Sequence, residues 1–277
     1  MDSFGAVPLS DVKEYWNRRP CNIRHSQKEV GTREYFEEVK ARKYFVEPHI
    51  PGFAEFERWN GSRVLEIGCG IGTDTLSFAE SGARVTAVDL SEKSIALARQ
   101  RAEVYGQQDR IEFYNGNSEE LSTLVPVSTY DLVYSFGVIH HTPHPEKVLN
   151  QIREYMGPES ELRLMVYSKA SYKLFQVMRE EAVWDLSRLD ELIARNSEAQ
   201  TGCPVTYTYT YNEARELLKG FDILEMRKAH IFTWDVDAYK RYEYKKDAAW
   251  AGVTDEQLEN LEKELGWHLL IRARRAS

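Results

Sequence analysis

Five short apolar segments between residues 61 and 168 alternate with segments of helical periodicity, and this alternation constrains the fold more than any other feature of the chain. The apolar segments are RVLEI (63–67), RVTAVD (84–89), IEFYN (111–115), YDLVYSF (130–136) and ELRLMVY (161–167). The segments between them carry apolar residues at helical spacing and end at glycines. Strand, helix and strand repeated at this spacing predict an α/β fold with a parallel, doubly wound sheet.

The flanking segments indicate more helices and two further strands. Before residue 61, Asp11 is expected to cap a first helix, and a second helix, over TREYFEEVKARKYF, is expected to end before Pro48. After residue 168, polar helical stretches separate two apolar segments, FDILEMRKAHIF (221–232) and WHLLIRAR (267–274). These two segments are expected to be strands that complete the sheet.

Composition argues against several classes of function. A formal net charge of −8 argues against a nucleic-acid partner, since neutralising phosphates requires a net basic face. The cysteines Cys21, Cys69 and Cys203 are far apart, which indicates neither a disulfide framework nor a metal site and favours a reducing, cytoplasmic setting. No segment approaches the roughly 20 apolar residues of a membrane span, and the first residues lack the pattern of a secretory leader. We therefore expect a soluble protein without a membrane partner.

A glycine-rich turn follows the first expected strand. Gly68, Gly70 and Gly72 lie in VLEIGCGIGTDT (64–75), between the strand and the helix after it. A parallel sheet forms its ligand crevice at this place, and a Cβ on any of the three would push away whatever lies over the turn. Asp89 ends the second strand, where a carboxylate can accept hydrogen bonds from both hydroxyls of a ribose. Both NAD and S-adenosylmethionine (SAM) carry such a ribose.

Three residues around this turn favour SAM over NAD. Thr73 occupies the place of the late glycine that lets a helix approach a pyrophosphate in G-x-G-x-x-G loops. Glu66 and Asp74 would repel a pyrophosphate at the helix N-terminus but suit a ligand with an ammonium and a sulfonium. A nicotinamide-dependent oxidoreductase stays open as an alternative.

The sequence resembles the class I SAM-dependent methyltransferases over residues 60 to 168, with four motifs in order. The motifs are VLEIGCGIGTDT (64–75), the acidic ribose loop VTAVDLS (85–91), the adenine loop IEFYNGNSEEL (111–121) and the fourth-strand motif YDLVYSFGVIHHTPHPEKVL (130–149). The resemblance implies a Rossmann-like, seven-stranded sheet in the order 3-2-1-4-5-7-6, with the last strand antiparallel and formed by WHLLIRAR. It also implies SAM as the methyl donor and S-adenosylhomocysteine (SAH) as the product.

With this resemblance, the chain is expected to have four parts. These are an N-terminal helical cap or lid (1–60), a SAM-binding core (61–168), a substrate-binding lid insertion (169–210) and a segment that completes the core sheet (211–277).

The resemblance also assigns contacts to the cofactor. The three glycines would approach the methionyl part, Asp89 would hold the ribose, Leu90 would pack on the adenine, and the main chain of Ser118 would meet an adenine ring nitrogen. The family commonly has an acidic residue where this chain has Asn117, whose amide oxygen can still accept from the adenine amino group. The expected cofactor contacts are Glu66, Gly68, Cys69, Gly70, Gly72, Thr73, Asp74, Asp89, Leu90, Asn117, Ser118, Ser135, Phe136 and Gly137.

Histidines are the candidate catalytic residues. His140 and His141 follow the fourth strand, close to the expected position of the sulfonium methyl, and His25 lies in the N-terminal segment. A neutral imidazole can take a proton from an attacking group near pH 7. The alternative is that the pair lines the cofactor pocket or caps the helix after Pro145. No carboxylate or cysteine keeps ligand spacing with His140, His141 and His144, so no metal is expected.

Aromatic residues in the added segments favour an enclosed pocket for a small molecule. They occur in YWNRRPCNIRHS (15–26), SKASYKLFQVMREEAVWDL (168–186) and CPVTYTYTY (203–211), and they can equally be ordinary packing. The candidate substrate-binding residues are Tyr15, Trp16, Arg24, Tyr172, Tyr207 and Tyr211. The alternatives are a methyltransferase acting on protein or RNA and a non-catalytic SAM-binding partner subunit. The aromatic cap suits a homodimer interface as well as a lid.

Overall fold

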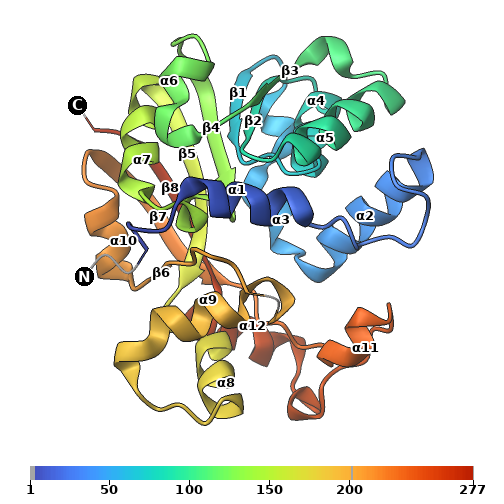
Figure 1. Cartoon of the computed structure of the whole chain (residues 1–277), viewed down its shortest axis with the longest axis vertical. Coiled ribbons are helices and arrows are strands. Elements are labelled where there is room, and N and C mark those ends of the chain that lie inside the picture. Colours follow the sequence, from blue (N-terminus) through green and yellow to red (C-terminus); the bar gives the residue numbers. More distant parts are fainter. Residues whose placement is uncertain (1–3, 201, 277) are drawn as a thin grey trace.

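The computed structural model describes residues 4–200 and 202–276, apart from the side chains of 197–200. One mixed sheet crosses the molecule (Figure 1). Its strands are β1 (Arg63–Ile67), β2 (Arg84–Asp89), β3 (Ile111–Asn115), β4 (Tyr130–Phe136), β5 (Met156–Ser168), β6 (Thr208–Tyr209), β7 (Phe221–Ala229) and β8 (His268–Arg275). The spatial order is β3-β2-β1-β4-β5-β8-β7, and the two-residue strand β6 also pairs with β5.

This order confirms the predicted Rossmann-like sheet and adds one short strand to it. β8 lies antiparallel between β5 and β7, as expected for WHLLIRAR. β5 begins at Met156, five residues earlier than the apolar pattern predicts, because Met156 pairs with Tyr130 before an irregularity in β5 shifts the register and Glu161 pairs with Leu132. The strand therefore includes the polar turn-like residues before Glu161, which carry no alternating apolar signal.

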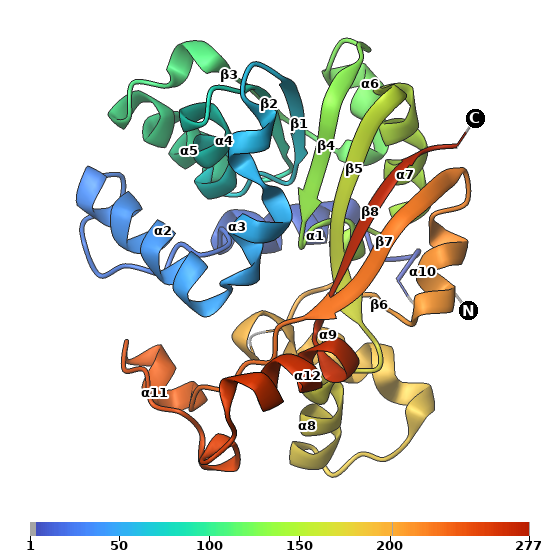
Figure 2. The same ribbon diagram turned by 180° about the vertical axis from the view of Figure 1, so that it is seen from behind.

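The two faces of the sheet are covered by different helices, because alternate residues of each buried strand point to opposite sides. Leu65 and Val133 face one core and Val64 and Leu132 face the other. The first core is closed by α6 (Leu121–Leu124), α7 (Pro145–Glu154) and α10 (Tyr211–Leu217). The second is closed by α3 (His49–Ala54), the 3₁₀ helix η1 (Phe56–Trp59), α4 (Thr73–Glu80) and α5 (Glu92–Val104). Figure 2 shows the second set from its own side of the sheet.

The remaining helices gather at the edge of the sheet where the parallel strands end (Figures 1 and 2). They are α1 (Leu9–Arg18), α2 (Arg33–Val46), α8 (Tyr172–Glu180), α9 (Leu189–Gln200), α11 (Val236–Lys240) and α12 (Asp255–Leu265). Short 3₁₀ turns complete the connections: η2 (Gln108–Arg110), η3 (Ser118–Glu120), η4 (Ile139–His141), η5 (Leu186–Arg188) and η6 (Ala248–Trp250). Within the described residues, no helix is long and apolar enough to cross a membrane.

The helix boundaries correct one expectation. α1 begins at Leu9 after Pro8, so Asp11 lies inside the first turn and caps nothing through its side chain. Its carboxylate still faces the positive end of the helix dipole. α2 ends at Val46, before Pro48 as predicted, and its N-terminus is capped by the Thr32 side chain, which accepts a hydrogen bond from the amide of Tyr35.

Candidate active site

The three glycines after β1 have left-handed backbone conformations that favour glycine. The φ angles are 78° at Gly68, 53° at Gly70 and 76° at Gly72. A Cβ on Gly68 would lie 2.2 Å from a methyl carbon of Val138, and one on Gly72 would lie 3.0 Å from the Cβ of Ala98. Those two glycines thus leave room for protein neighbours. Gly70 is the one that leaves room for a ligand, because the nearest atom to its Cβ would be that of Cys21 at 4.0 Å.

Asp89 connects this glycine loop to the end of β2. Its Oδ2 accepts a hydrogen bond from the amide of Gly70 over 2.8 Å, and its Oδ1 accepts one from the amide of Ser91 over 2.8 Å. Burial raises the pKa of Asp89 to about 6, although these two hydrogen bonds favour the ionised form. The carboxylate is therefore fixed in orientation while it lines the cavity described below.

A buried guanidinium holds the other side of the loop. Arg101, on α5, is 1% exposed. It donates hydrogen bonds to the carbonyl oxygens of Ile71 (3.1 Å) and Phe36 (2.9 Å), and to the hydroxyl of Thr73. It therefore ties the glycine loop to α2 and α5 at once. Sequence reasoning missed this residue, although an arginine on the apolar face of a helical pattern is a signal that could have found it.

Two buried carboxylates lie below the loop in different electrostatic surroundings. Asp74 accepts hydrogen bonds from the ammonium of Lys43 (2.7 Å) and from the hydroxyls of Tyr44 (3.0 Å) and Tyr134 (3.0 Å). Glu66 instead accepts a hydrogen bond from a neutral group, the hydroxyl of Thr75, over 2.5 Å. Burial and the nearby Asp74 charge raise the pKa of Glu66 to about 8. At neutral pH this carboxyl is thus protonated until a cation approaches it.

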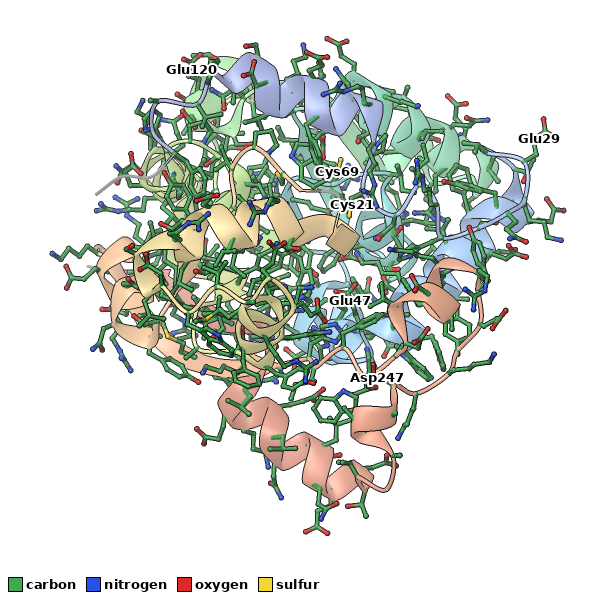
Figure 3. All side chains as sticks on the ribbon, turned by 60° about the horizontal axis from the view of Figure 1, so that its bottom comes forward. Cys21, Glu29, Glu47, Cys69, Glu120 and Asp247 are labelled. Atoms are coloured by element: carbon green, nitrogen blue, oxygen red, sulfur yellow. The ribbon has the colours of Figure 1, made fainter. Side chains whose placement is uncertain are left out.

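These groups line a cavity of about 240 Å³ at the ends of the parallel strands. Over β2 and β3 its wall is formed by Asp89, Leu90, Asn117 and Ser118, together with Leu9, Val12 and Trp16 from α1. Over β4, β5 and β8 its wall is formed by Phe136, Met165, Tyr167 and His268, together with Glu47. Figure 3 shows Cys21, Cys69 and Glu47, which all line the cavity, in the middle of the view, whereas Glu29 and Glu120 lie at the outer edge of the molecule.

We refer to the wall over β4, β5 and β8 as the histidine end, because three imidazoles meet there. Nδ1 of His268 lies 2.9 Å from Nε2 of His49, and Nε2 of His268 lies 3.6 Å from Oε1 of Glu47. The ring of His230 lies 4.8 Å from that of His268, centroid to centroid. Burial lowers the pKa of His230 to about 4 and holds the pKa values of His49 and His268 below their usual range. All three imidazoles are therefore neutral at pH 7.

The structure separates the three candidate catalytic histidines. His141 lines the cavity, and its Nδ1 lies 2.7 Å from the carbonyl oxygen of Val205, so Nδ1 carries the proton. His140 is fully buried behind the cavity wall, with its ring centroid 4.0 Å from that of Tyr167. His25 is also outside the cavity wall, with its Nε2 3.3 Å from the hydroxyl of Tyr239, and burial lowers its pKa to about 3.

Most of the expected cofactor contacts meet in the cavity wall. All of them line it except Gly72 and Ser135, whose hydroxyl donates to the carbonyl oxygen of Ile67 over 3.1 Å. The amide oxygen of Asn117, expected to face adenine, accepts a hydrogen bond from the amide of Glu119 over 3.0 Å. Its position is thus fixed by the turn that begins η3.

Of the expected substrate-binding residues, only Trp16 lines the cavity. Tyr15 borders a separate surface hollow beside η5 and α9, and Arg24 is held through its carbonyl oxygen by the hydroxyl of Tyr242. The ring of Tyr172 packs on Trp250, and that of Tyr207 packs on Phe4. Tyr211 packs at the border of the core around α10.

The sequence missed several cavity residues, among them Lys43, Glu47, Tyr167 and His268. Lys43 and Glu47 lie in and after a helix whose apolar pattern gives no reason to single them out. His268 could have been found from the topology. It begins an antiparallel strand, so its amino end lies where the parallel strands have their carboxyl ends.

Comparison with known proteins relates most of this chain to one family. A family model described as a methyltransferase domain matches residues 59–237. The chain is 30% identical over 128 residues to the ubiquinone biosynthesis O-methyltransferase of Aromatoleum aromaticum, covering 46% of the chain and 53% of that protein. It is 33% identical over 118 residues to the mitochondrial ubiquinone biosynthesis O-methyltransferase of Schizosaccharomyces pombe, covering 42% of each. The matches thus span about half the length of these relatives.

Solved structures share the fold over a longer stretch. The chain superimposes on magnesium protoporphyrin IX methyltransferase from Synechocystis with bound SAH, with a TM-score of 0.60, 16% identity, and coverage of 97% of this chain and 100% of that one. A SAM-dependent methyltransferase from Mesorhizobium loti gives a TM-score of 0.55 at 20% identity, covering 82% of this chain and 97% of that one. The likeness extends beyond the glycine loop to the added helices.

Proposed function

Because the chain belongs to the class I SAM-dependent methyltransferases, we propose that it transfers the methyl group of SAM to a small molecule bound at the histidine end of the cavity. One observation carries the proposal. The glycine loop and Asp89 line the same cavity as Glu47, Tyr167 and His268, so a donor and an acceptor have adjacent places in one enclosed space.

The described residues fit SAM part by part. Asp89, already held by two amides, would accept hydrogen bonds from the ribose hydroxyls, and Gly70 would let the ligand approach the main chain. Glu66 would pair with the ammonium of the amino-acid part, and Lys43 would attract its carboxylate. Leu90 and Ser118 would face the adenine. Bound SAM supplies a methyl group on a positively charged sulfur, which is activated without help from the protein.

With the ribose on Asp89 and the amino-acid part near Glu66 and Lys43, the methyl group of SAM would point away from β2 and toward the histidine end. Three groups in this wall can accept a proton from the acceptor: His268, His141 and Glu47. His141 is the best placed, because the contact of its Nδ1 with the carbonyl oxygen of Val205 puts the proton on Nδ1 and makes Nε2 the basic nitrogen, whereas Nε2 of His268 faces Glu47. His140 and His25 would support the wall from behind and would not touch the acceptor.

A small organic acceptor is supported by the way the cavity is closed. Leu9, Val12 and Trp16 of α1 and the following Cys21 form part of its wall. The Ser91 hydroxyl donates to the side chain of Asn17 over 2.9 Å, which fastens α1 to the start of α5. A helix over this part of the wall favours a small acceptor over a segment of protein or RNA. The names of the relatives, which are O-methyltransferases of ubiquinone biosynthesis, also favour a small acceptor.

Labelled methyl transfer tests the proposal. The full chain would be incubated with methyl-labelled SAM and a cell extract separated into a small-molecule fraction and a fraction of protein and RNA. We expect label in small molecules with the wild type and with His144→Ala, whose side chain is outside the cavity wall, and a large loss of label with Asp89→Ala.

Two results would contradict the proposal. Label found only in protein or RNA would identify a macromolecular substrate. SAM binding without transfer to either fraction would indicate a non-catalytic partner subunit.

A further inference from the structure

We propose that Glu47, His230 and His268 bind one divalent first-row transition-metal ion at the histidine end of the cavity. Each residue offers one ligand atom, and these atoms lie within 4.8 Å of one another. Two of the three residues, Glu47 and His268, also line the cavity. No spacing in the sequence indicates this metal site, because the ligands come from segments about 180 and 40 residues apart along the chain.

The fold brings these three segments together at one place. Glu47 directly follows α2, and His230 directly follows β7. His268 begins β8 and pairs with Ala229, the last residue of β7. This pairing places His230 beside His268, with ring centroids 4.8 Å apart. The carboxylate of Glu47 completes the group, with Oε1 3.6 Å from Nε2 of His268.

The ligand types and spacings match a transition metal. Two imidazoles and one carboxylate suit Zn²⁺, Fe²⁺ or Mn²⁺ better than Mg²⁺, which prefers oxygen ligands. Ligand atoms about 2.0–2.2 Å from a tetrahedral metal are about 3.3–3.6 Å from one another. The 3.6 Å between Glu47 and His268 already lies at this spacing, and a small rotation of side chains would close the remaining distances.

A further histidine orients one of the ligands. Nδ1 of His268 lies 2.9 Å from Nε2 of His49. If His268 donates its Nδ1 proton to His49, its Nε2 lone pair is directed to the side on which Glu47 lies. Metal-binding histidines usually have such a second partner, which fixes the tautomer and the ring orientation.

The main chain also favours a fixed position for His230. Its φ angle is 70°, a left-handed conformation that residues other than glycine rarely adopt. Its carbonyl oxygen accepts a hydrogen bond from the amide of Trp267 over 2.8 Å, so the turn after β7 is tied to the residue before His268. The two histidines are thus held in register by main-chain contacts that do not involve their rings.

Such an ion would define the class of acceptor, a consequence that rests on the proposed function. Three protein ligands leave a coordination position open toward the cavity, where an acceptor with a phenol, enol or carboxyl oxygen can bind. The acceptor loses its O–H proton to solvent or to His141, and its oxygen forms the bond to the methyl carbon. The electron pair of the breaking C–S bond stays on sulfur, which gives SAH.

Metal titration of the full chain tests the inference. After treatment with a chelator, the protein would be titrated with Zn²⁺ in a calorimeter and with Co²⁺ in a visible-light spectrometer. We expect one ion per chain and a Co²⁺ spectrum of low coordination number with nitrogen and oxygen ligands. Mg²⁺ at the same concentration should not displace either ion.

Two variants and a control make the test specific. Glu47→Gln keeps the shape of the side chain, and His230→Asn supplies a residue that tolerates a positive φ. Each should weaken Zn²⁺ binding by about 10–100-fold or more, whereas His144→Ala should bind Zn²⁺ as the wild type does. SAM affinity, measured on the same samples, reports whether each variant is folded.

The outcomes separate this inference from the proposed function. Absence of saturable Zn²⁺ binding to the wild type, or equal binding by wild type, Glu47→Gln and His230→Asn, would overturn the metal site. Methyl transfer that persists in the metal-free protein would overturn the role given to the ion. Specific Zn²⁺ binding without any methyl transfer would support the site and contradict the proposed function alone.

Discussion

The main-chain amide of Gly70 donates a hydrogen bond to Oδ2 of Asp89 over 2.8 Å, and this bond joins the glycine loop to the end of the neighbouring strand. Asp89 therefore shapes the loop as well as facing the cavity. A substitution there acts on SAM binding in two ways, through the lost ribose contacts and through the position of Gly70.

Asp89→Ala should lower SAM affinity by about 2–4 kcal/mol, because charge-assisted hydrogen bonds to the ribose are lost together with the anchor of the loop. Asp89→Asn should show a smaller loss of SAM affinity, since its amide still presents one acceptor oxygen in place of two. Calorimetric titration with SAM measures both. Asp109→Asn, at an exposed aspartate, is the matched control. An Asp89→Ala variant that binds SAM like the control would remove this residue from the site.

Arg101→Met should destabilise the protein by roughly 2–4 kcal/mol, because it removes the buried hydrogen bonds to the carbonyl oxygens of Ile71 and Phe36 and to the hydroxyl of Thr73. SAM affinity should also fall, since the glycine loop loses one of its supports. Urea unfolding and SAM titration measure the two effects. Arg110→Met, at an exposed arginine, should change neither by much. If Arg101→Met unfolds at the wild-type urea concentration, the guanidinium does not support the loop.

The SAM-free protein should become less stable as pH rises, because its folded state holds a proton on Glu66 that the unfolded chain releases. The folded protein keeps this proton up to about pH 8, whereas the ordinary carboxyl of an unfolded chain loses it near 4.5. Between these values the folded state binds more protons, so the free energy of unfolding falls with increasing pH, by up to about 1.4 kcal/mol per pH unit. Urea unfolding at pH 5, 6, 7 and 8 should show a flatter dependence for Glu66→Gln. Parallel curves for the two proteins would contradict the assignment.

SAM binding at pH 7 should release a proton from Glu66. An ammonium beside the carboxyl favours its ionised form and lowers its pKa from about 8. Calorimetry in two buffers with different ionisation enthalpies detects the release, and Glu66→Gln should abolish most of it. Equal proton release by both proteins would place the ammonium elsewhere.

Removal of residues 1–26 should weaken SAM binding as well as slow methyl transfer. Leu9, Val12, Trp16 and Cys21 line the cavity, so the deletion opens the wall and admits water. We expect at least a tenfold loss of SAM affinity, by roughly 1.4 kcal/mol or more, and a larger loss of turnover. SAM titration and labelled transfer on one preparation measure both. Retained turnover would show that α1 only covers the sheet.

The sequence predicted the core sheet well, because its strands are buried and its helices end at glycines. Alternation of apolar segments located β1 to β4, and the family resemblance supplied the order and the antiparallel β8. β6 was missed because two residues, Thr208 and Tyr209, are too short for a pattern. The early start of β5 depends on the pairing of Met156 with Tyr130 before an irregularity in β5, which no local pattern records.

The site was predictable where its residues follow strand ends along the chain. Gly70 and Asp89 were found for this reason. Glu47 and His268 meet only because a loop after α2 folds against an antiparallel strand, which is a tertiary event. Two tyrosines of the added segments were predicted to bind substrate but do not line the cavity. Tyr172 and Tyr207 pack on the rings of Trp250 and Phe4, because the added helices need buried aromatic contacts of their own.

The most direct test of this account compares turnover and SAM affinity in His268→Gln, with the labelled small-molecule fraction as acceptor. His268 and Asp89 both line the cavity, but His268 begins β8 and Asp89 ends β2, with β1, β4 and β5 between these strands, so His268 lies at the place assigned to the acceptor. We predict that turnover falls by about 100-fold or more while the SAM dissociation constant changes by less than about threefold. Unchanged turnover, or a loss of SAM affinity as large as the loss of turnover, would show that the acceptor does not bind at the histidine end.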